Sequence, residues 1–179
     1  MNLYFITGNK EKFKEVKSFI ASMEQLDLDL AEIQELDPKK IIEEKLKATS
    51  LQHKGGLIIE DTSLCFDAFN GLPGPLIKWF LKSIGNEGLA RLAKSLSSNA
   101  GRAITWLGYK NSKGDIQYFK GEIKGHIVLP RGMNGFGWDA IFQPLQSTKT
   151  FAEMSFEEKM TYSMRRIAIQ KLKKYIDKD

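Results

Sequence analysis

Residues 2–20 read NLYFITGNKEKFKEVKSFI, and this stretch decides the fold class. Four of its first five residues (2–6) are apolar, with β-favouring members, and the five predict a strand. The polar turn Thr7-Gly8-Asn9 interrupts that pattern. Apolar residues then recur with the period of a helix, which we expect over residues 10–22. The stretch therefore predicts a strand, a tight turn and a helix in direct succession.

The alternation of strands and helices continues beyond this stretch. A second strand is expected at 26–33, a helix at 38–53 and a short buried strand at 57–59. The helix begins on Pro38, a residue that suits the first turn of a helix. This order predicts an α/β chain with a partly parallel sheet, because parallel strands are joined by helical crossovers.

The second half of the chain carries longer elements. Two helices are expected at 75–84 and 86–97, and two strands at 102–110 and 115–128. The turn residues between these strands are typical of a hairpin. A long C-terminal helix is expected from about residue 155 to residue 175.

Length, charge and cysteine content exclude several classes of protein. The 179 residues suit one large domain or two joined lobes. The net charge of +5 favours anionic partners such as nucleotides, but the lysines form no run of five, so we expect no nucleic-acid partner. No apolar run approaches the roughly 18 residues of a membrane span, so we expect no membrane partner. The single cysteine and the absence of a signal peptide predict a cytoplasmic protein.

The first candidate site is the turn Thr7-Gly8-Asn9 together with Lys12. Phosphates bind between a strand end and a helix start because free backbone N–H groups and the helix dipole favour an anion. Gly8 lets the backbone approach closely, and Lys12 adds a positive charge one turn into the helix. The spacing of a Walker loop is absent. An ordinary capped helix with solvated lysines is the alternative.

The second candidate site is the acidic pair Glu60-Asp61, which follows the predicted strand 57–59. Paired carboxylates can hold Mg²⁺, and a carboxylate can also orient or deprotonate a water. Glu35, after the second predicted strand, could complete the set. A turn with Asp61 as a helix cap is the alternative.

The third candidate site is the glycine-rich segment Gly135-Phe136-Gly137-Trp138-Asp139. Aromatic side chains between glycines, beside a carboxylate, suit stacking on a nucleobase and reading of its hydrogen-bonding edge. A turn whose aromatic side chains return to the core is the alternative.

The fourth candidate site is on the last predicted helix. Spacings of four and seven residues place Lys159, Ser163 and Arg166 on one helix face, with Arg165 near its edge. Cationic groups on one face could hold a triphosphate, and an arginine could contact it with two parallel bonds. A solvated helix face is the alternative.

Taken in order, these motifs resemble the inosine triphosphate pyrophosphatase family, the house-cleaning enzymes that act on non-canonical purine nucleotides. The resemblance runs nearly from end to end of the chain. The matching blocks are TGNKEK (7–12), EDTSLCF (60–66), GLPGPLIKWF (71–80), GFGWDAIFQP (135–144) and TFAEMSFEEK (150–159).

The resemblance implies an elongated α/β fold with a twisted mixed β-sheet flanked by helices. It implies that residues 1–179 form a single NTP pyrophosphatase domain of two lobes with a central nucleotide-binding cleft, usually in a homodimer. The implied reaction is Mg²⁺-assisted attack of water at the α–β phosphate linkage of ITP, dITP or XTP. The products are the nucleoside monophosphate and pyrophosphate.

The resemblance also implies roles for individual residues. Asp61 is the catalytic carboxylate and a metal ligand, and Glu35 is the second metal ligand. The substrate-binding residues are Thr7, Gly8, Asn9, Lys12, Lys45, Phe136, Gly137, Trp138, Asp139, Lys159, Ser163 and Arg165.

Two positions depart from the family pattern. Met164 stands where the family has a histidine that reads the 6-oxo group of the purine, and Met160 stands where it has an asparagine. Methionine donates no hydrogen bond, so discrimination that depends on that bond is lost. Two alternatives to a strict ITP and XTP hydrolase therefore stay open. One is an NTPase of relaxed or altered specificity, and the other is a nucleotide-binding module without turnover.

Overall fold

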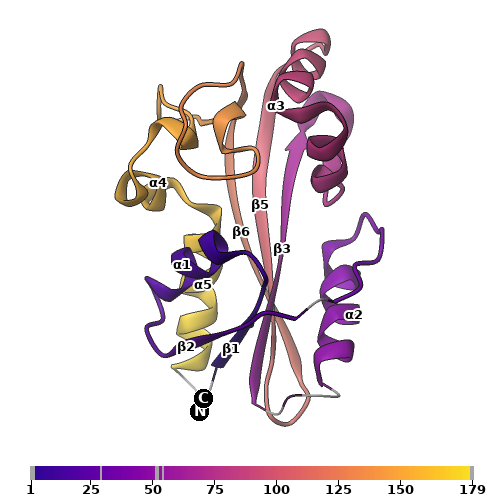
Figure 1. Cartoon of the computed structure of the whole chain (residues 1–179), viewed down its shortest axis with the longest axis vertical. Coiled ribbons are helices and arrows are strands. Elements are labelled where there is room, and N and C mark those ends of the chain that lie inside the picture. Colours follow the sequence, from indigo (N-terminus) through magenta and orange to yellow (C-terminus); the bar gives the residue numbers. More distant parts are fainter. Residues whose placement is uncertain (1–2, 29, 51–52, 54, 178–179) are drawn as a thin grey trace. The chain divides into compact units, whose positions relative to one another are not determined.

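The computed structural model of the chain describes residues 3–28, 30–50, 53 and 55–177. Within these residues seven strands form one sheet in the order β2-β1-β3-β5-β6-β7, and β4 pairs with β3. The pairs β1–β2 and β1–β3 are parallel, whereas β3–β4 and β6–β7 are antiparallel. Helices flank the sheet (Figure 1). The predicted α/β class with a mixed sheet is confirmed.

The elements follow one another in alternation along the first half of the chain. The strands are β1 (Leu3–Ile6), β2 (Met23–Leu26), β3 (Gly56–Phe66), β4 (Pro73–Gly74), β5 (Ala100–Lys110), β6 (Ile116–Ile127) and β7 (Phe142–Pro144). The helices are α1 (Lys10–Lys17), α2 (Pro38–Ser50), α3 (Ile77–Ser95), α4 (Phe156–Tyr162) and α5 (Met164–Ile176). In the part of the chain that the structure describes, no helix combines the length and the apolar character that a bilayer crossing requires.

The chain divides into two compact units, which we call unit 1 and unit 2. Unit 1 consists of Met1–Asp61, Thr105–Gly121 and Arg165–Asp179. Unit 2 consists of Thr62–Ile104 and Glu122–Met164. The long strands β3, β5 and β6 therefore contribute residues to both units.

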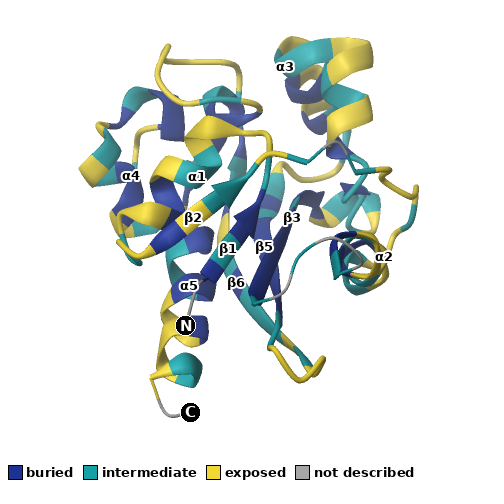
Figure 2. Cartoon of the chain, turned by 60° about the horizontal axis from the view of Figure 1, so that its bottom comes forward, coloured by how far each residue is buried: buried dark blue, intermediate teal, exposed yellow. Residues whose placement is uncertain are grey.

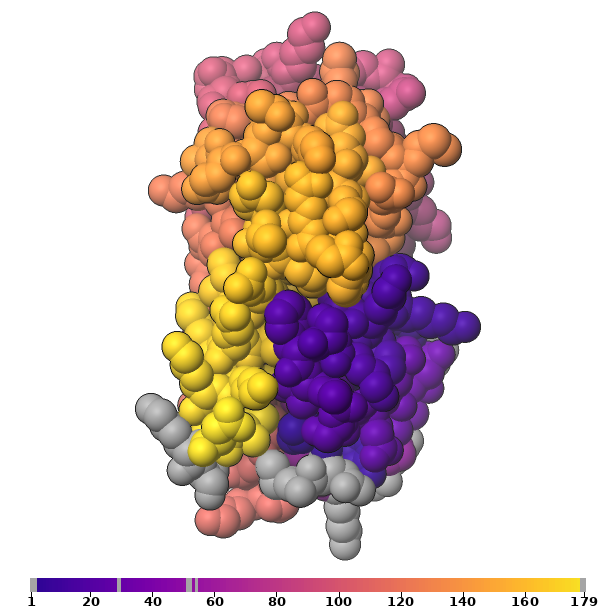
Figure 3. Space-filling model, turned by 90° about the vertical axis from the view of Figure 1, so that its left-hand side faces the viewer, coloured from indigo at the N-terminus to yellow at the C-terminus, as the bar shows by residue number. Residues whose placement is uncertain are grey.

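The core of unit 1 follows from the alternation of side chains along its strands. In β3, Leu57 and Ile59 pack in a cluster with Ile42 and Leu46 of α2. Ile58 points to the other face and packs with residues of α1 and α5. Figure 1 shows α2 on one side of these strands and α1 with α5 on the other, and Figure 3 shows the C-terminal segment beside the N-terminal one. Because both faces of these strands are covered, β3 is apolar on both faces.

The core of unit 2 is one cluster in which aromatic rings meet the helix α3. Trp138, Phe142 and Phe151 contact one another with ring centroids 5.4–6.3 Å apart. Leu89 and Ala93 of α3 belong to the same cluster. Buried residues lie on one side of α3 and exposed residues on the other (Figure 2).

The predicted end of the third strand is wrong. β3 continues to Phe66, so Glu60 and Asp61 lie inside the strand and not in a turn after it. Both residues are buried, at 7% and 6% exposure. The strand continues because the residues that follow, such as Leu64, are buried in the core of unit 2.

The second strand and the first helix also differ from the prediction. α1 ends at Lys17 and not at residue 22, and Ser18 caps it by donating its hydroxyl to the carbonyl of Glu15. β2 then begins at Met23, so it shares only Leu26 with the predicted strand 26–33, of which residue 29 lies outside the described residues. The early end of α1 leaves Met23 free to pair with Leu3 of β1.

The predicted C-terminal helix is broken. Ser163 has an extended backbone (φ −70°, ψ 124°) and separates α4 from α5. Ser155 caps α4 through the N–H of Glu158, as its spacing predicts. The face that was expected to carry Lys159, Ser163 and Arg166 together therefore does not exist.

Two predicted boundaries are confirmed. Gly85, with φ 65°, interrupts α3 between the two helices expected at 75–84 and 86–97. The turn between β5 and β6 is closed by hydrogen bonds between Asn111 and Asp115, as the hairpin pattern predicts. Both signals are local, since glycine and asparagine favour these backbone conformations by themselves.

Candidate active site

Asp61 of unit 1 is a buried carboxylate with a raised pKa. Burial raises the pKa of this carboxyl from its usual value of 3.8 to about 6. The charges of Lys12 and Lys45 lower the pKa, and those of Glu32 and Glu60 raise it further. The carboxylate is therefore surrounded by other charges in a dry environment, where electrostatic interactions are strong.

The neighbouring carboxylate, Glu60, is held from two sides. The ammonium of Lys12 lies 3.0 Å from Oε1 of Glu60. The guanidinium of Arg165 donates from Nε to Oε2 at 2.5 Å and from Nη2 to Oε1 at 3.0 Å. This two-pronged contact fixes the orientation of the Glu60 side chain, whose exposure is 2%.

Arg165 also binds a second buried carboxylate. Its Nη1 donates to Oε2 of Glu15, which lies on α1. Burial by itself lowers the pKa of the Arg165 guanidinium, but the charges of Glu60 and Glu15 hold it above its usual range. Arg165 is therefore charged, and in this structure its guanidinium is bonded to two carboxylates.

The turn before α1 is organised by its own side chains. Asn9 caps the helix by accepting from the N–H of Lys12 at 3.0 Å, and the N–H of Asn9 donates to Oγ1 of Thr7 at 3.1 Å. A Cβ at Gly8 would lie 2.8 Å from Oδ1 of Asp27, so a larger residue there would have to displace the Asp27 carboxylate. The turn is thus a capped helix start, and the positive end of the α1 helix dipole lies at this turn.

The predicted metal ligand Glu35 lies in a different setting from Asp61. Its carboxylate accepts from the N–H groups of Leu36 and Asp37 and from the ammonium of Lys40, and these bonds lower the pKa of Glu35. Glu32 is the acidic residue of this segment whose charge acts on Asp61. Glu32 thus acts on Asp61, and the role of Glu35 as a metal ligand stays a prediction.

Lys45 joins the same group from α2. Its ammonium forms an ion pair with the carboxylate of Glu32, and the charges of both residues influence Asp61. Over the described ranges, no cluster of three or more histidine, cysteine, aspartate and glutamate side chains could hold a metal ion by itself.

A second group of predicted residues meets in unit 2. Oδ2 of Asp139 accepts from the ammonium of Lys159 at 2.7 Å and from the N–H of Phe136 at 2.9 Å. The same ammonium lies 4.6 Å from the ring centroid of Phe136. A Cβ at Gly135 would lie 2.1 Å from Oδ2 of Asp139, so only glycine lets the loop close over this carboxylate.

Three predicted residues of unit 2 belong to its interior. Trp138 is 7% exposed and packs against Phe142 and Phe151, so its ring returns to the core. Ser163 is 2% exposed and lies in the break between α4 and α5. Met164 is 3% exposed and belongs to the same core cluster as Trp138. Phe136, which is half-buried, remains the aromatic ring of the loop outside this cluster.

The structure brings most predicted residues into one of two groups, but not in the predicted combinations. Lys159 joins Asp139 in unit 2, whereas Arg165 joins Glu60 in unit 1. Sequence reasoning missed Glu15 and Glu32. Glu15 lies in an ordinary helix sequence and Glu32 in an ordinary loop sequence, so no local pattern marks either as a site residue. The contact between Glu15 and Arg165 joins positions 150 residues apart.

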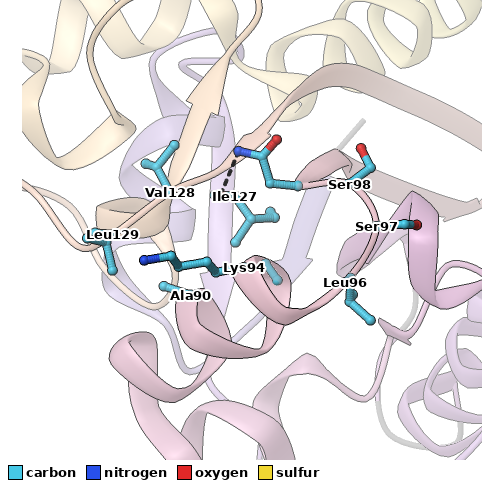
Figure 4. A pocket seen from close by; sticks show the side chains of 10 residues that line it. Ala90, Lys94, Leu96, Ser97, Ser98, Ile127, Val128 and Leu129 are labelled. Carbon is cyan, nitrogen blue, oxygen red and sulfur yellow. Dashed lines mark hydrogen bonds between the residues drawn. The ribbon is translucent and has the colours of Figure 1, made fainter.

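A pocket of about 470 Å³ lies elsewhere in unit 2 (Figure 4). It is lined by Lys94, Leu96, Ser97 and Leu129, among others, and it contains no predicted site residue.

The chain is similar to a known family over nearly its whole length. The Ham1 family matches residues 3–175. Inosine triphosphate pyrophosphatase of Schizosaccharomyces pombe is 40% identical over 182 residues, covering 99% of this chain and 96% of that protein. The protein of the same name from Candida glabrata is 40% identical over 183 residues, covering 96% of this chain and 95% of that protein.

Solved structures share the fold at lower identity. The Ham1 protein of Staphylococcus aureus superposes with a TM-score of 0.83 at 24% identity and covers 98% of each chain. A HAM1 protein from Coxiella burnetii superposes with a TM-score of 0.85 at 20% identity and covers both chains completely.

Proposed function

The chain belongs to the Ham1 family and is a nucleoside triphosphate pyrophosphatase, and we propose that its substrates are the non-canonical purine triphosphates ITP, dITP and XTP. In the proposed reaction a water oxygen bonds to the α-phosphorus while the bond to the α–β bridging oxygen breaks. The products are the nucleoside monophosphate and pyrophosphate. Relatives named inosine triphosphate pyrophosphatase, at 40% identity, support the choice of ITP. The observation that carries the proposed attack of water is the buried carboxylate of Asp61, whose pKa is raised to about 6.

Asp61 takes the proton of the attacking water in this proposal. A general base works best when its pKa lies near the working pH, because it is then both deprotonated and basic. Burial supplies that pKa, and Lys12 and Lys45 keep it from rising further. Glu60 is already held by Lys12 and Arg165, so Asp61 is the better base of the two.

The triphosphate is bound by the turn before α1 and by two lysines. The N–H groups at the start of α1 and the side chains of Thr7 and Asn9 offer donors to phosphate oxygens. Gly8 permits a close approach of the backbone. Lys12 and Lys45 supply two of the positive charges that a triphosphate requires.

The residues around Asp61 fit a Mg²⁺ ion. Asp61 is a carboxylate whose pKa is raised mainly by burial, and the charge of Glu32, which pairs with Lys45, acts on it. We propose that Asp61 and Glu32 hold the ion, in place of the expected Glu35. Mg²⁺ is commonly bound by one or two carboxylates together with substrate phosphates, so two protein carboxylates suffice for this proposal. When bound, the ion neutralises charge on the phosphate oxygens.

The base is bound by the loop Gly135–Asp139 of unit 2. The half-buried ring of Phe136 stacks on the purine, with Trp138 packed behind the loop in the core. Asp139 and Lys159, which are bonded to each other, offer an acceptor and a donor to the base edge. We further propose that Ser163 contributes at the base and that Arg165 acts by holding Glu60. Residues 1–179 then act as one NTP pyrophosphatase domain.

The pH dependence of the reaction reports on Asp61. We expect kcat/KM for ITP to rise with pH through an apparent pKa of about 6, because the base must lose its proton. Glu32→Gln should shift this rise of kcat/KM (the acidic limb of the pH profile) to lower pH, since the charge of Glu32 raises the pKa of Asp61. Initial rates between pH 4.5 and 8.5 measure both.

Lys40→Met is the matched control for the pH profile, because Lys40 is exposed and pairs with Glu35. It should leave the limb in place. A wild-type profile that is flat between pH 5 and 7 would contradict the assignment of Asp61 as the base.

Substrate selectivity is tested with a panel of nucleoside triphosphates. We expect Mg²⁺-dependent pyrophosphate release from ITP and XTP to exceed release from ATP by at least about 10-fold. Met164→His places a donor at the position that the family resemblance assigns to reading the 6-oxo group, so it should raise the ratio of ITP to ATP turnover by about 3- to 10-fold. Because Met164 is buried in the core of unit 2, the imidazole should also lower the unfolding temperature. Met164→Leu has no donor and serves as the control.

Each outcome of the panel separates the candidate functions. Equal turnover of ITP and ATP would contradict selectivity and would support an NTPase of relaxed specificity. The methionine at position 164 is the feature of the sequence that favours this alternative. If no nucleotide released pyrophosphate, the remaining candidate function would be a nucleotide-binding module without turnover.

A further inference from the structure

Two hydrogen bonds between its own residues hold the loop Gly135–Asp139. The N–H of Phe136 donates to Asp139 Oδ2 at 2.9 Å, and the N–H of Asp139 donates to the carbonyl of Phe136 at 3.1 Å. Two residues of the loop, Gly135 and Gly137, have left-handed backbones with φ 77° and 62°. The carbonyl of Gly137 takes part in neither of these two hydrogen bonds.

A side chain from a distant helix holds that carbonyl. Nδ2 of Asn86 donates to the oxygen of Gly137 at 2.9 Å, across 51 positions of sequence. Asn86 directly follows Gly85, whose φ of 65° interrupts α3. The residue whose amide reaches the loop therefore directly follows the break in α3.

The Asn86 amide is kept at a cost in stability. Its Oδ1 is buried and has no hydrogen-bond partner in the part of the chain that the structure describes. Rotating the amide would satisfy neither group, since Oδ1 would then face the Gly137 carbonyl. A buried acceptor without a partner destabilises a protein, so the contact is not explained by stability.

We propose that Asn86 is a positioning residue for base recognition, which fixes the Gly137–Trp138 peptide so that the ring of the neighbouring Phe136 is held ready for the purine. This inference rests on the proposed function of the loop. Ordering the loop before the base arrives removes an entropic cost from binding. Asn86 itself touches neither the base nor the phosphates in this proposal, so its effect is confined to affinity.

Asn86→Leu tests the proposal, because leucine has a similar volume and removes both the donor and the orphaned acceptor. We expect the KM for ITP to rise by about 3- to 10-fold with kcat within about 2-fold of wild type, the pattern of lost uniform binding. The unfolding temperature should stay within about 2 °C of wild type or rise, because an unsatisfied buried group is removed. A residue with a merely structural role would lower the unfolding temperature and leave KM unchanged.

Asn99→Leu is the matched control in the same unit. The Asn99 amide also donates to a backbone carbonyl far away in sequence, that of Ile127 at 3.3 Å, at the pocket drawn in Figure 4. It should leave KM unchanged. Asn86→Asp, which keeps the size but replaces the donor by an acceptor, should raise KM at least as much as Asn86→Leu.

Coupling to the ring completes the test. In a Phe136→Ala background, Asn86→Leu should have no further effect on KM, because the ring through which Asn86 acts is gone. An unchanged KM for Asn86→Leu, full additivity with Phe136→Ala, or an equal rise in KM for Asn99→Leu would each overturn the proposal. Failure of the wild-type protein to hydrolyse ITP would instead overturn the proposed function, so the two failures are distinguishable.

Discussion

Asp61→Asn is expected to lower kcat/KM for ITP by about 10³-fold, the largest effect on activity of any single substitution proposed for this chain. Asparagine keeps the size of the side chain but accepts no proton at neutral pH and binds a divalent cation less well than a carboxylate. Pyrophosphate release with Mg²⁺ measures the loss. If Asp61→Asn kept wild-type turnover, the assignment of Asp61 would fail, and with it the mechanism.

The same substitution should not destabilise the fold. The folded chain holds the Asp61 proton more tightly than the unfolded chain, since the pKa is raised from 3.8 to about 6. Raising the pH from 4 through 6 therefore lowers the free energy of unfolding, by up to about 3 kcal/mol at 1.4 kcal/mol per pKa unit. Asp61→Asn removes this loss, so at pH 7 its unfolding temperature should equal or exceed that of wild type. A loss of activity together with a stable fold separates catalysis from folding.

Glu35→Gln is the matched control for Asp61→Asn. Glu35 is bonded to the turn before α2 and to Lys40, so this change should leave kcat/KM within about 2-fold of wild type. Glu32→Gln should weaken the dependence on Mg²⁺. If Glu35→Gln weakened the dependence on Mg²⁺ and Glu32→Gln did not, Glu35 would be the metal ligand, as expected from the sequence.

Arg165→Met is expected to have the largest effect on stability. Its guanidinium is 1% exposed and neutralises Glu15 and Glu60, which are buried as well. Removing one partner of a buried ion pair costs roughly 3–5 kcal/mol because the remaining charge is left without compensation. For a chain of this size the unfolding temperature should fall by roughly 10 °C, which calorimetry or thermal circular dichroism measures.

Two further variants make this prediction specific. Arg102→Met removes the arginine of a partly exposed pair with Asp67 and should cost at most about 1 kcal/mol. Glu15→Gln combined with Arg165→Met should recover part of the lost stability, because the uncompensated carboxylate is neutralised. Equal destabilisation by Arg102→Met and Arg165→Met would contradict the role assigned to the buried network.

Local patterns predicted much of the fold. The continuous apolar run Leu57-Ile58-Ile59 predicted a buried strand, and the hairpin turn at 111–115 joins β5 to β6 as expected. The glycine at position 85 marked the break in α3. These features depend on backbone preferences and on the periodicity of apolar residues, which are properties of a few neighbouring positions.

The sequence by itself therefore determined the α/β class, most elements and the identity of Asp61 and Asp139 as candidate site residues. Only the tertiary structure decided how the charges pair. Glu60 meets Arg165 across 105 positions, and Ser163 breaks the last helix without a proline or glycine to mark it. Glu32 and Glu35 look alike in sequence, yet Glu32 acts on Asp61. The physical reason is that burial and electrostatic interactions depend on distances in space, which no local pattern of residues encodes.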